Sequence, residues 1–73
     1  MKVKVRIDTL TDVRDFVAEA SKSSAPIYLT DGTSLKISAQ SLLGVMYTME
    51  WNDVYCTCEN DVYHLIERFV VID

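Results

Sequence analysis

One stretch of the chain, residues 25–46, decides the fold, and it reads Ala-Pro-Ile-Tyr-Leu-Thr-Asp-Gly-Thr-Ser-Leu-Lys-Ile-Ser-Ala-Gln-Ser-Leu-Leu-Gly-Val-Met. In a hairpin that turns at Asp31-Gly32, the apolar residues Ile27 and Leu29 of its first part face Leu35 and Ile37 of its second. An Asp-Gly pair accepts the positive φ angles that a two-residue hairpin turn requires. The stretch therefore predicts two antiparallel strands joined by a tight turn.

A short helix is expected directly after this hairpin. Ser38 or Ser41 is a suitable N-cap, because a serine hydroxyl accepts a hydrogen bond from a backbone N–H of the first turn. The helix extends to about Thr48, although Gly44 within it lowers helix propensity by ~1 kcal/mol relative to alanine. We therefore expect only one or two turns.

A strand and a helix precede the hairpin. Residues 2–8 alternate between apolar and polar side chains, which predicts a strand with one solvated face. Thr9 or Thr11 then caps a helix that ends near residues 22–24. Its apolar positions have the i, i+3, i+4, i+7 spacing of a helix with one buried face: Val13, Phe16, Val17 and Ala20.

A second strand and helix pair follows the short helix. Residues 54–59 alternate, with Val54, Cys56 and Cys58 on the inward face of a fourth strand. Asn60 or Asp61 is then expected to cap a last helix. The buried positions of that helix are Val62, Leu65, Ile66 and Phe69.

The predicted order is β-α-β-β-α-β-α, which belongs to the α+β class. A two-residue turn joins only antiparallel strands, so the order excludes a doubly wound parallel sheet. It indicates a four-stranded antiparallel sheet with its helices packed on one face. With 73 residues, we expect a single domain, residues 1–73.

Composition excludes several classes of function. The net charge of −4 argues against nucleic-acid binding, which needs clustered Lys and Arg. Lys2, Lys4 and Arg6 do cluster, but at period 2 they form the solvated side of a strand. The longest apolar run, residues 69–72, is too short to span a membrane, and no signal peptide opens the chain. We expect a cytoplasmic protein with no membrane partner.

Cys56 and Cys58 are the only cysteines. On one strand they point to the same face, without the geometry of a relaxed disulfide. Two thiolates with His64 as the single nitrogen ligand do not complete a tetrahedral zinc site. We interpret both as small core residues of a reducing compartment, and we expect no metal and no cofactor.

The quoted stretch resembles the histidine phosphocarrier HPr of the bacterial sugar phosphotransferase system. The segment Ala39-Gln40-Ser41-Leu42-Leu43-Gly44-Val45-Met46 is similar to the family's Lys-Ser-hydrophobic-hydrophobic-Gly-Val-Met motif, with Gln40 in place of Lys. Residues 16–20, the Asp31-Gly32 hairpin and the acidic turn at residues 59–61 also match HPr-like spacing. The resemblance implies an open-faced β-sandwich with strand order 1-4-2-3.

HPr-like carriers hold a transferable phosphate on a histidine before the first helix, and this sequence has no histidine before His64. Aligned through residues 16–17, the family's histidine falls near Thr9 and its arginine near Thr11. Aligned instead to put Arg14 on that arginine, the histidine falls on Asp12, and Asp15 replaces the proline. A threonine phosphate is a low-energy ester and cannot pass its phosphoryl group on. The resemblance therefore implies an HPr-like fold without histidine phosphotransfer and predicts no enzyme.

Ser41 matches the serine that a dedicated kinase phosphorylates in HPr-like proteins, and the HPr paralogue Crh keeps that serine while lacking the histidine. The resemblance implies that Leu42, Leu43 and Met46 form a surface for protein partners of the phosphotransferase system, at least one of them exposed. The plainer interpretation is that Ser41 is only a helix cap and that these side chains are core.

Two rival functions remain open. One is a phosphocarrier that uses His64 or Asp12 as its acceptor. His64 has Asp61 and Arg68 at i−3 and i+4, as an ordinary exposed helix residue would. The other is an unrelated assembly subunit on the same scaffold.

Overall fold

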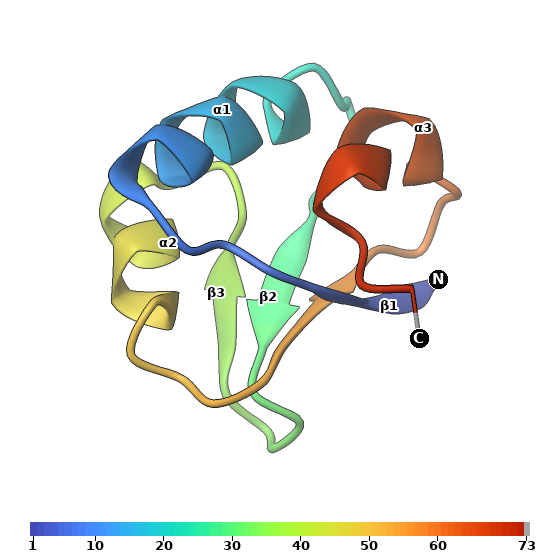
Figure 1. Cartoon of the computed structure of the whole chain (residues 1–73). Coiled ribbons are helices and arrows are strands. Elements are labelled where there is room, and N and C mark those ends of the chain that lie inside the picture. Colours follow the sequence, from blue (N-terminus) through green and yellow to red (C-terminus); the bar gives the residue numbers. More distant parts are fainter. Residues whose placement is uncertain (73) are drawn as a thin grey trace.

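The computed structural model describes residues 1–72 and contains a four-stranded antiparallel sheet with three α-helices packed on one face (Figure 1). The strand order is β1-β4-β2-β3, as the resemblance implied. The elements, in chain order, are β1 (Lys2–Val5), α1 (Leu10–Ala20), β2 (Tyr28–Thr30), β3 (Lys36–Ser38), α2 (Leu42–Thr48), β4 (Val54–Thr57), α3 (Tyr63–Ile66) and a 3₁₀ turn η1 (Glu67–Phe69). This confirms the predicted α+β class and element order.

Helix α1 begins at the first of the two predicted caps. Thr9 is the N-cap, and its side chain accepts from the backbone N–H of Asp12. The side chains of Val13, Phe16 and Ala20 are buried, as their spacing predicted. The helix ends at Ala20, two residues before the expected region.

The antiparallel pairing of β2 with β3 is confirmed, but the predicted register and turn are wrong. Leu29 pairs with Ile37, but Thr30 pairs with Lys36, so five residues form the connection. The carboxylate of Asp31 accepts from the backbone N–H of Thr33 at 2.9 Å, a local side-chain turn that replaces the expected two-residue turn. Leu35 consequently lies in the loop and is exposed.

Strand β1 is shorter than predicted, and its outer edge is covered. The N–H of Arg6 donates to the carbonyl of Phe69 at 2.8 Å, and the N–H of Val71 donates to the carbonyl of Lys4 at 2.9 Å. Val5 also bridges Val70 in an antiparallel sense. The chain after η1 therefore supplies main-chain partners along β1, which no local sequence signal indicated.

The last helix also differs from the prediction. Neither Asn60 nor Asp61 is its N-cap; Val62 holds that position without a side-chain hydrogen bond. Asp61 instead accepts from the N–H of Tyr63, only two residues on. The helical segment is therefore short and continues as the 3₁₀ turn that places Phe69 in the core.

A single apolar core lies between the helices and the sheet. Phe16 and Phe69 meet at its centre, with ring centroids 5.0 Å apart in an edge-to-face arrangement. The buried apolar residues are Val5, Ile7, Val13, Phe16, Ala20, Ile27, Leu29, Ala39, Val45, Val54, Cys56, Cys58, Val62, Ile66 and Phe69. Within the described part, no helix has the length and apolar character needed to cross a membrane.

Cys56 and Cys58 are both buried and free, as their place in the strand pattern predicted. Burial, together with the neighbouring Cys58 thiol, raises the pKa of Cys56 to about 12. The thiolate is the reactive form of cysteine, so this environment makes Cys56 inert at neutral pH.

We expect native Cys56 and Cys58 to react with a thiol reagent at pH 8 at least 100-fold more slowly than in the unfolded chain. Because the pKa of Cys56 is higher in the folded chain, the unfolded chain loses the Cys56 proton at a lower pH than the folded chain does. This group therefore leaves stability unchanged below pH ~9 and lowers it as the pH rises towards 12. Stopped-flow thiol labelling with and without denaturant measures the rates, and fast labelling of the native protein would contradict the core assignment.

Candidate functional site

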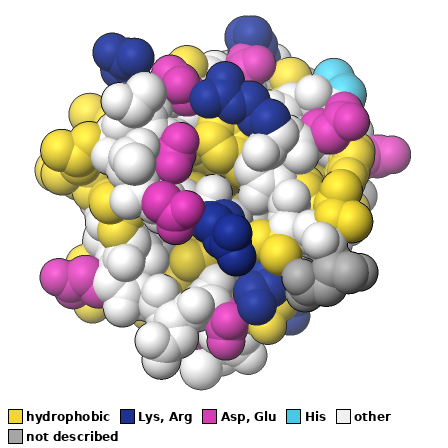
Figure 2. Space-filling model, viewed as in Figure 1, with side chains coloured by type: hydrophobic (Ala, Val, Ile, Leu, Met, Phe, Trp, Pro, Cys, Tyr) yellow, Lys and Arg dark blue, Asp and Glu magenta, His cyan; other side chains and the backbone are white. Residues whose placement is uncertain are grey.

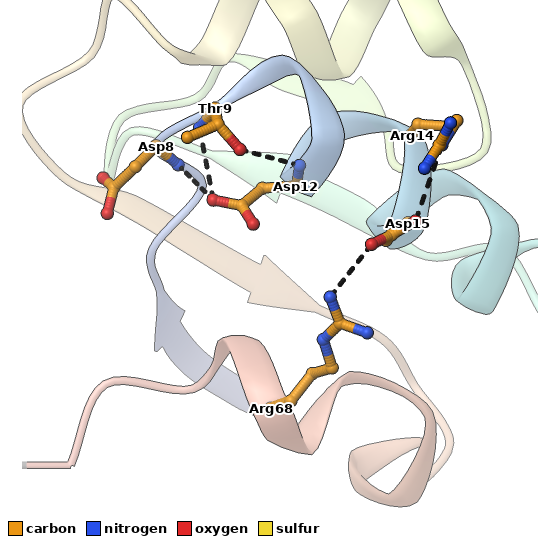
Figure 3. A network of polar contacts seen from close by, with 6 residues as sticks. All are labelled: Asp8, Thr9, Asp12, Arg14, Asp15 and Arg68. Carbon is orange, nitrogen blue, oxygen red and sulfur yellow. Dashed lines mark hydrogen bonds and ion pairs between the residues drawn. The ribbon is translucent and has the colours of Figure 1, made fainter.

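The start of α1 is held by a closed set of hydrogen bonds around Asp12 (Figure 3). One carboxylate oxygen of Asp12 accepts from the backbone N–H groups of Asp8 at 3.1 Å and Thr9 at 3.2 Å. In return, the N–H of Asp12 donates to the Thr9 hydroxyl at 3.0 Å. The chain thus satisfies three main-chain donors at this helix end with its own side chains.

Asp12 is a fixed negative charge at this position. The hydrogen bond from the Asp8 N–H, aided by those at Thr9, lowers the pKa of Asp12 below its usual value. Because the pKa is lower in the folded state, the contribution to stability is present above the unfolded pKa and lost as the pH falls through the folded one. At neutral pH a carboxylate therefore lies where a helix N-terminus would otherwise attract an external anion.

Arg14 is directed away from the helix start. Its Nε lies 3.6 Å from Oδ1 of Asp15. The other carboxylate oxygen of Asp15, Oδ2, lies 3.0 Å from the guanidinium of Arg68 (Figure 3). Both arginine side chains are largely exposed, so these ion pairs are screened by solvent. The structure thus brings Thr9 and Asp12 together, while Arg14 and Asp15 belong to a separate network that ties α1 to η1.

His64 lies on α3, at the opposite end of the chain from the start of α1. Its side chain is exposed, as the cyan group of Figure 2 shows. It lines a shallow hollow together with Glu19, Glu67 and Arg68. Among the described residues, no group of three or more His, Cys, Asp or Glu is arranged to hold a metal ion.

Helix α2 begins at Ser41, the second of the two predicted caps. The Ser41 hydroxyl accepts from the N–H of Gly44 at 3.2 Å. Gly44 lies so close to β3 that a Cβ atom there would be 2.5 Å from the Cγ2 atom of Ile37. The absence of a side chain at Gly44 therefore sets how closely α2 packs on the sheet.

The outer face of α2 is apolar and uncovered. Val45 and Thr48 point into the core, while four large side chains on this helix are exposed: Leu42 at 51%, Leu43 at 78%, Met46 at 39% and Tyr47 at 56%. We call these four residues the α2 patch; Figure 2 shows hydrophobic side chains gathered over this side of the molecule. An exposed apolar group of this kind is a common mark of a binding surface.

Sequence reasoning missed Tyr47 and the role of Gln40. Tyr47 follows Leu43 by four residues, so the helical spacing already assigned it to the same face. The Gln40 amide donates to the carbonyls of Ala20 at 3.1 Å and Ser23 at 3.4 Å, which joins the end of α1 to the start of α2. No local signal indicates a contact across twenty residues.

Comparison with known proteins supports the fold assignment. No protein-family model matches the sequence, and no curated protein matches it significantly. The structure is similar to the crystal structure of HPr-C-His from Thermoanaerobacter tengcongensis, with a TM-score of 0.74. The match covers 96% of this chain and 90% of that one, at 22% sequence identity. The chain therefore has an HPr-like fold.

Proposed function

We propose that the chain is a non-catalytic regulatory or protein-interaction module related to the phosphoenolpyruvate-dependent sugar phosphotransferase system, acting in the bacterial cytoplasm without histidine phosphotransfer. The observation that carries this proposal is the start of α1. Thr9 stands at the N-cap, and the carboxylate of Asp12 occupies the main-chain donors around it. A phosphoryl group arriving there meets a negative charge and no imidazole.

The α2 patch supports a role in protein binding. Its four side chains expose apolar surface on one helix face, next to the Ser41 cap. Aromatic and methionine side chains are enriched in protein interfaces, and Met46 and Tyr47 supply both kinds. We assign partner docking to Leu42, Leu43, Met46 and Tyr47.

Ser41 is the proposed regulatory site. Its side chain is exposed at the first residue before α2, where first-turn N–H groups and the helix dipole favour an added phosphate. The phosphate oxygens take over the hydrogen bond that the hydroxyl accepts from Gly44. Modification is therefore compatible with the fold and places two negative charges beside the α2 patch.

The rival phosphocarrier is less well supported by the local chemistry. Glu19, Glu67 and Arg68 share the hollow with His64; Arg68 is paired with Asp15, so the two carboxylates oppose an anionic phosphoryl donor there. Oδ2 of Asp12 accepts two main-chain hydrogen bonds that hold the start of α1, and a phosphoryl group on that oxygen would break both.

Two phosphorylation reactions test the proposal. With phosphoenolpyruvate and the general phosphotransferase enzyme, we expect no acid-labile phosphate on the chain, whereas an active HPr is labelled in parallel. With HPr kinase and ATP, we expect one acid-stable phosphate, mapped to Ser41 by mass spectrometry. It should be absent in Ser41→Ala and retained in the control Ser34→Ala, a serine of the exposed β2–β3 loop.

The α2 patch is tested in the same kinase reaction. Leu43→Ser should raise the KM for the protein substrate by about tenfold, since it removes a large exposed apolar contact. Leu35→Ser, which changes an exposed leucine outside the patch, is the control and should leave KM within twofold. Stoichiometric labelling of His64 or Asp12, an unmodified Ser41, or a KM that Leu43→Ser leaves unchanged would overturn the proposed function.

A further inference from the structure

The sheet face opposite the helices is built from hydrogen-bond donors. The strand register places eight side chains on it in two rows: Lys2, Thr57, Tyr28 and Ser38 in one, and Lys4, Tyr55, Thr30 and Lys36 in the other. Three of these residues are lysines and five carry hydroxyl groups, and none of the eight is acidic; Thr30 is buried and its hydroxyl donates to the carbonyl of Thr33, so the other seven make up the accessible face. The chain as a whole has a net charge of −4, whereas these eight residues carry a positive net charge.

Two of the lysines are positioned by tyrosines of the central strands. The Lys2 ammonium lies 5.2 Å from the centre of the Tyr55 ring, and the Lys36 ammonium lies 5.8 Å from the centre of the Tyr28 ring. Cation–π contacts at these distances are attractive and hold long side chains against the sheet. The face therefore presents two lysine–tyrosine pairs on neighbouring strands, each with an ammonium and a phenol.

Acidic residues flank this face. Asp53 precedes β4 and pairs with Lys4 at 3.1 Å. Glu59 follows β4 and lines a hollow of about 240 Å³ with Tyr28, Lys36 and Thr57 among its other walls. The positive region is thus bounded at both ends of the central strand β4.

We propose that this open face docks a short acidic peptide segment of a partner protein, in an extended conformation. Carboxylates accept hydrogen bonds and carry the charge that the lysines complement, and the flat face has no helix to displace. The molecule is about 24 to 26 Å across. An extended segment of about eight residues, at roughly 3.3 Å per residue, spans it.

The same observations disfavour single-stranded nucleic acid as the occupant. Base stacking needs a free aromatic face, and here a lysine covers each of the two tyrosine rings.

Binding of fluorescein-labelled octapeptides tests the proposal by fluorescence anisotropy at low salt. We expect saturable binding of a peptide that alternates glycine and glutamate and none of one that alternates glycine and lysine. The double variant Lys2→Gln/Lys36→Gln should weaken binding about fivefold or more. The control Arg14→Gln/Lys22→Gln removes two exposed charges on the helical side and should change binding less than twofold.

A map of amide chemical shifts locates the bound peptide. Changes should concentrate on the four strands, and Leu43→Ser should not alter them, so failure of the α2 patch and failure of this site are distinguishable. Equal weakening in both double variants, changes centred on α2, or tighter binding of a single-stranded thymidine octamer than of the acidic peptide would each overturn the proposal.

Discussion

Phe16→Ala is expected to destabilise the domain severely at 25 °C. Phe16 has no exposed surface and meets Phe69 edge to face at the centre of the core. Truncating a fully buried phenylalanine lowers the free energy of unfolding by about 3 to 5 kcal/mol. A domain of this size has a total stability of about 4 to 11 kcal/mol, so the loss removes at least about a quarter of it and, at the lower end of that range, all of it.

Urea denaturation followed by far-ultraviolet circular dichroism measures this effect. Phe16→Leu keeps most of the side-chain volume and is the matched control, with an expected loss of about 1 to 1.5 kcal/mol. A cooperative transition of Phe16→Ala within 1 kcal/mol of the original chain would show that the two rings do not form the centre of the core.

Gly44→Ala should destabilise the domain by about 1 to 2 kcal/mol, although alanine is the better helix former by ~1 kcal/mol. The added Cβ would lie 2.5 Å from Cγ2 of Ile37, so α2 or β3 must move. Ile37 is β-branched and sits in a strand, so its side chain has little freedom to turn away. The steric cost therefore exceeds the gain in propensity.

A double-mutant cycle separates these two effects. Ile37→Ala removes the Cγ2 atom and leaves the milder contacts of 3.3 Å with Cβ and Oγ of Ser41, so in that background Gly44→Ala should raise stability by up to ~1 kcal/mol through helix propensity. The sign of the Gly44→Ala effect thus reverses between the two backgrounds. A loss of the same size in both would mean that the Ile37 contact is not its cause.

The elements that sequence patterns predicted are those specified by local chemistry. The Thr9 and Ser41 caps and the buried stripe of α1 all depend on residues within one or two turns. The errors have local causes too: the Asp31 carboxylate bonds to Thr33 and opens the expected tight turn, and Val62 offers no side-chain cap to lengthen α3. Neither the hydrogen bond of Asp31 nor the missing cap at Val62 changes the apolar periodicity of the sequence. The periodicity therefore could not reveal these two differences.

The candidate site was predicted in part. Exposure of at least one large side chain on α2 followed from the shortness of the helix, and the structure exposes all of Leu42, Leu43 and Met46. The self-contained hydrogen bonds of Asp12 were not foreseen, although Thr9 and Asp12 have the spacing of a capping box. The lysine–tyrosine pairs depend on strand register, which a sequence pattern does not supply between distant strands.

The chain segment beside β1 limits how copies of this protein can join. An exposed sheet edge is a template on which another chain adds a strand, and a sheet with two such edges can extend without end. Here the main chain of Phe69 and Val71 already bonds along β1, while β3 lies at the other end of the sheet. Two molecules that meet through β3 therefore form a closed pair whose outer ends are both blocked, and growth of a continuous ribbon stops at two.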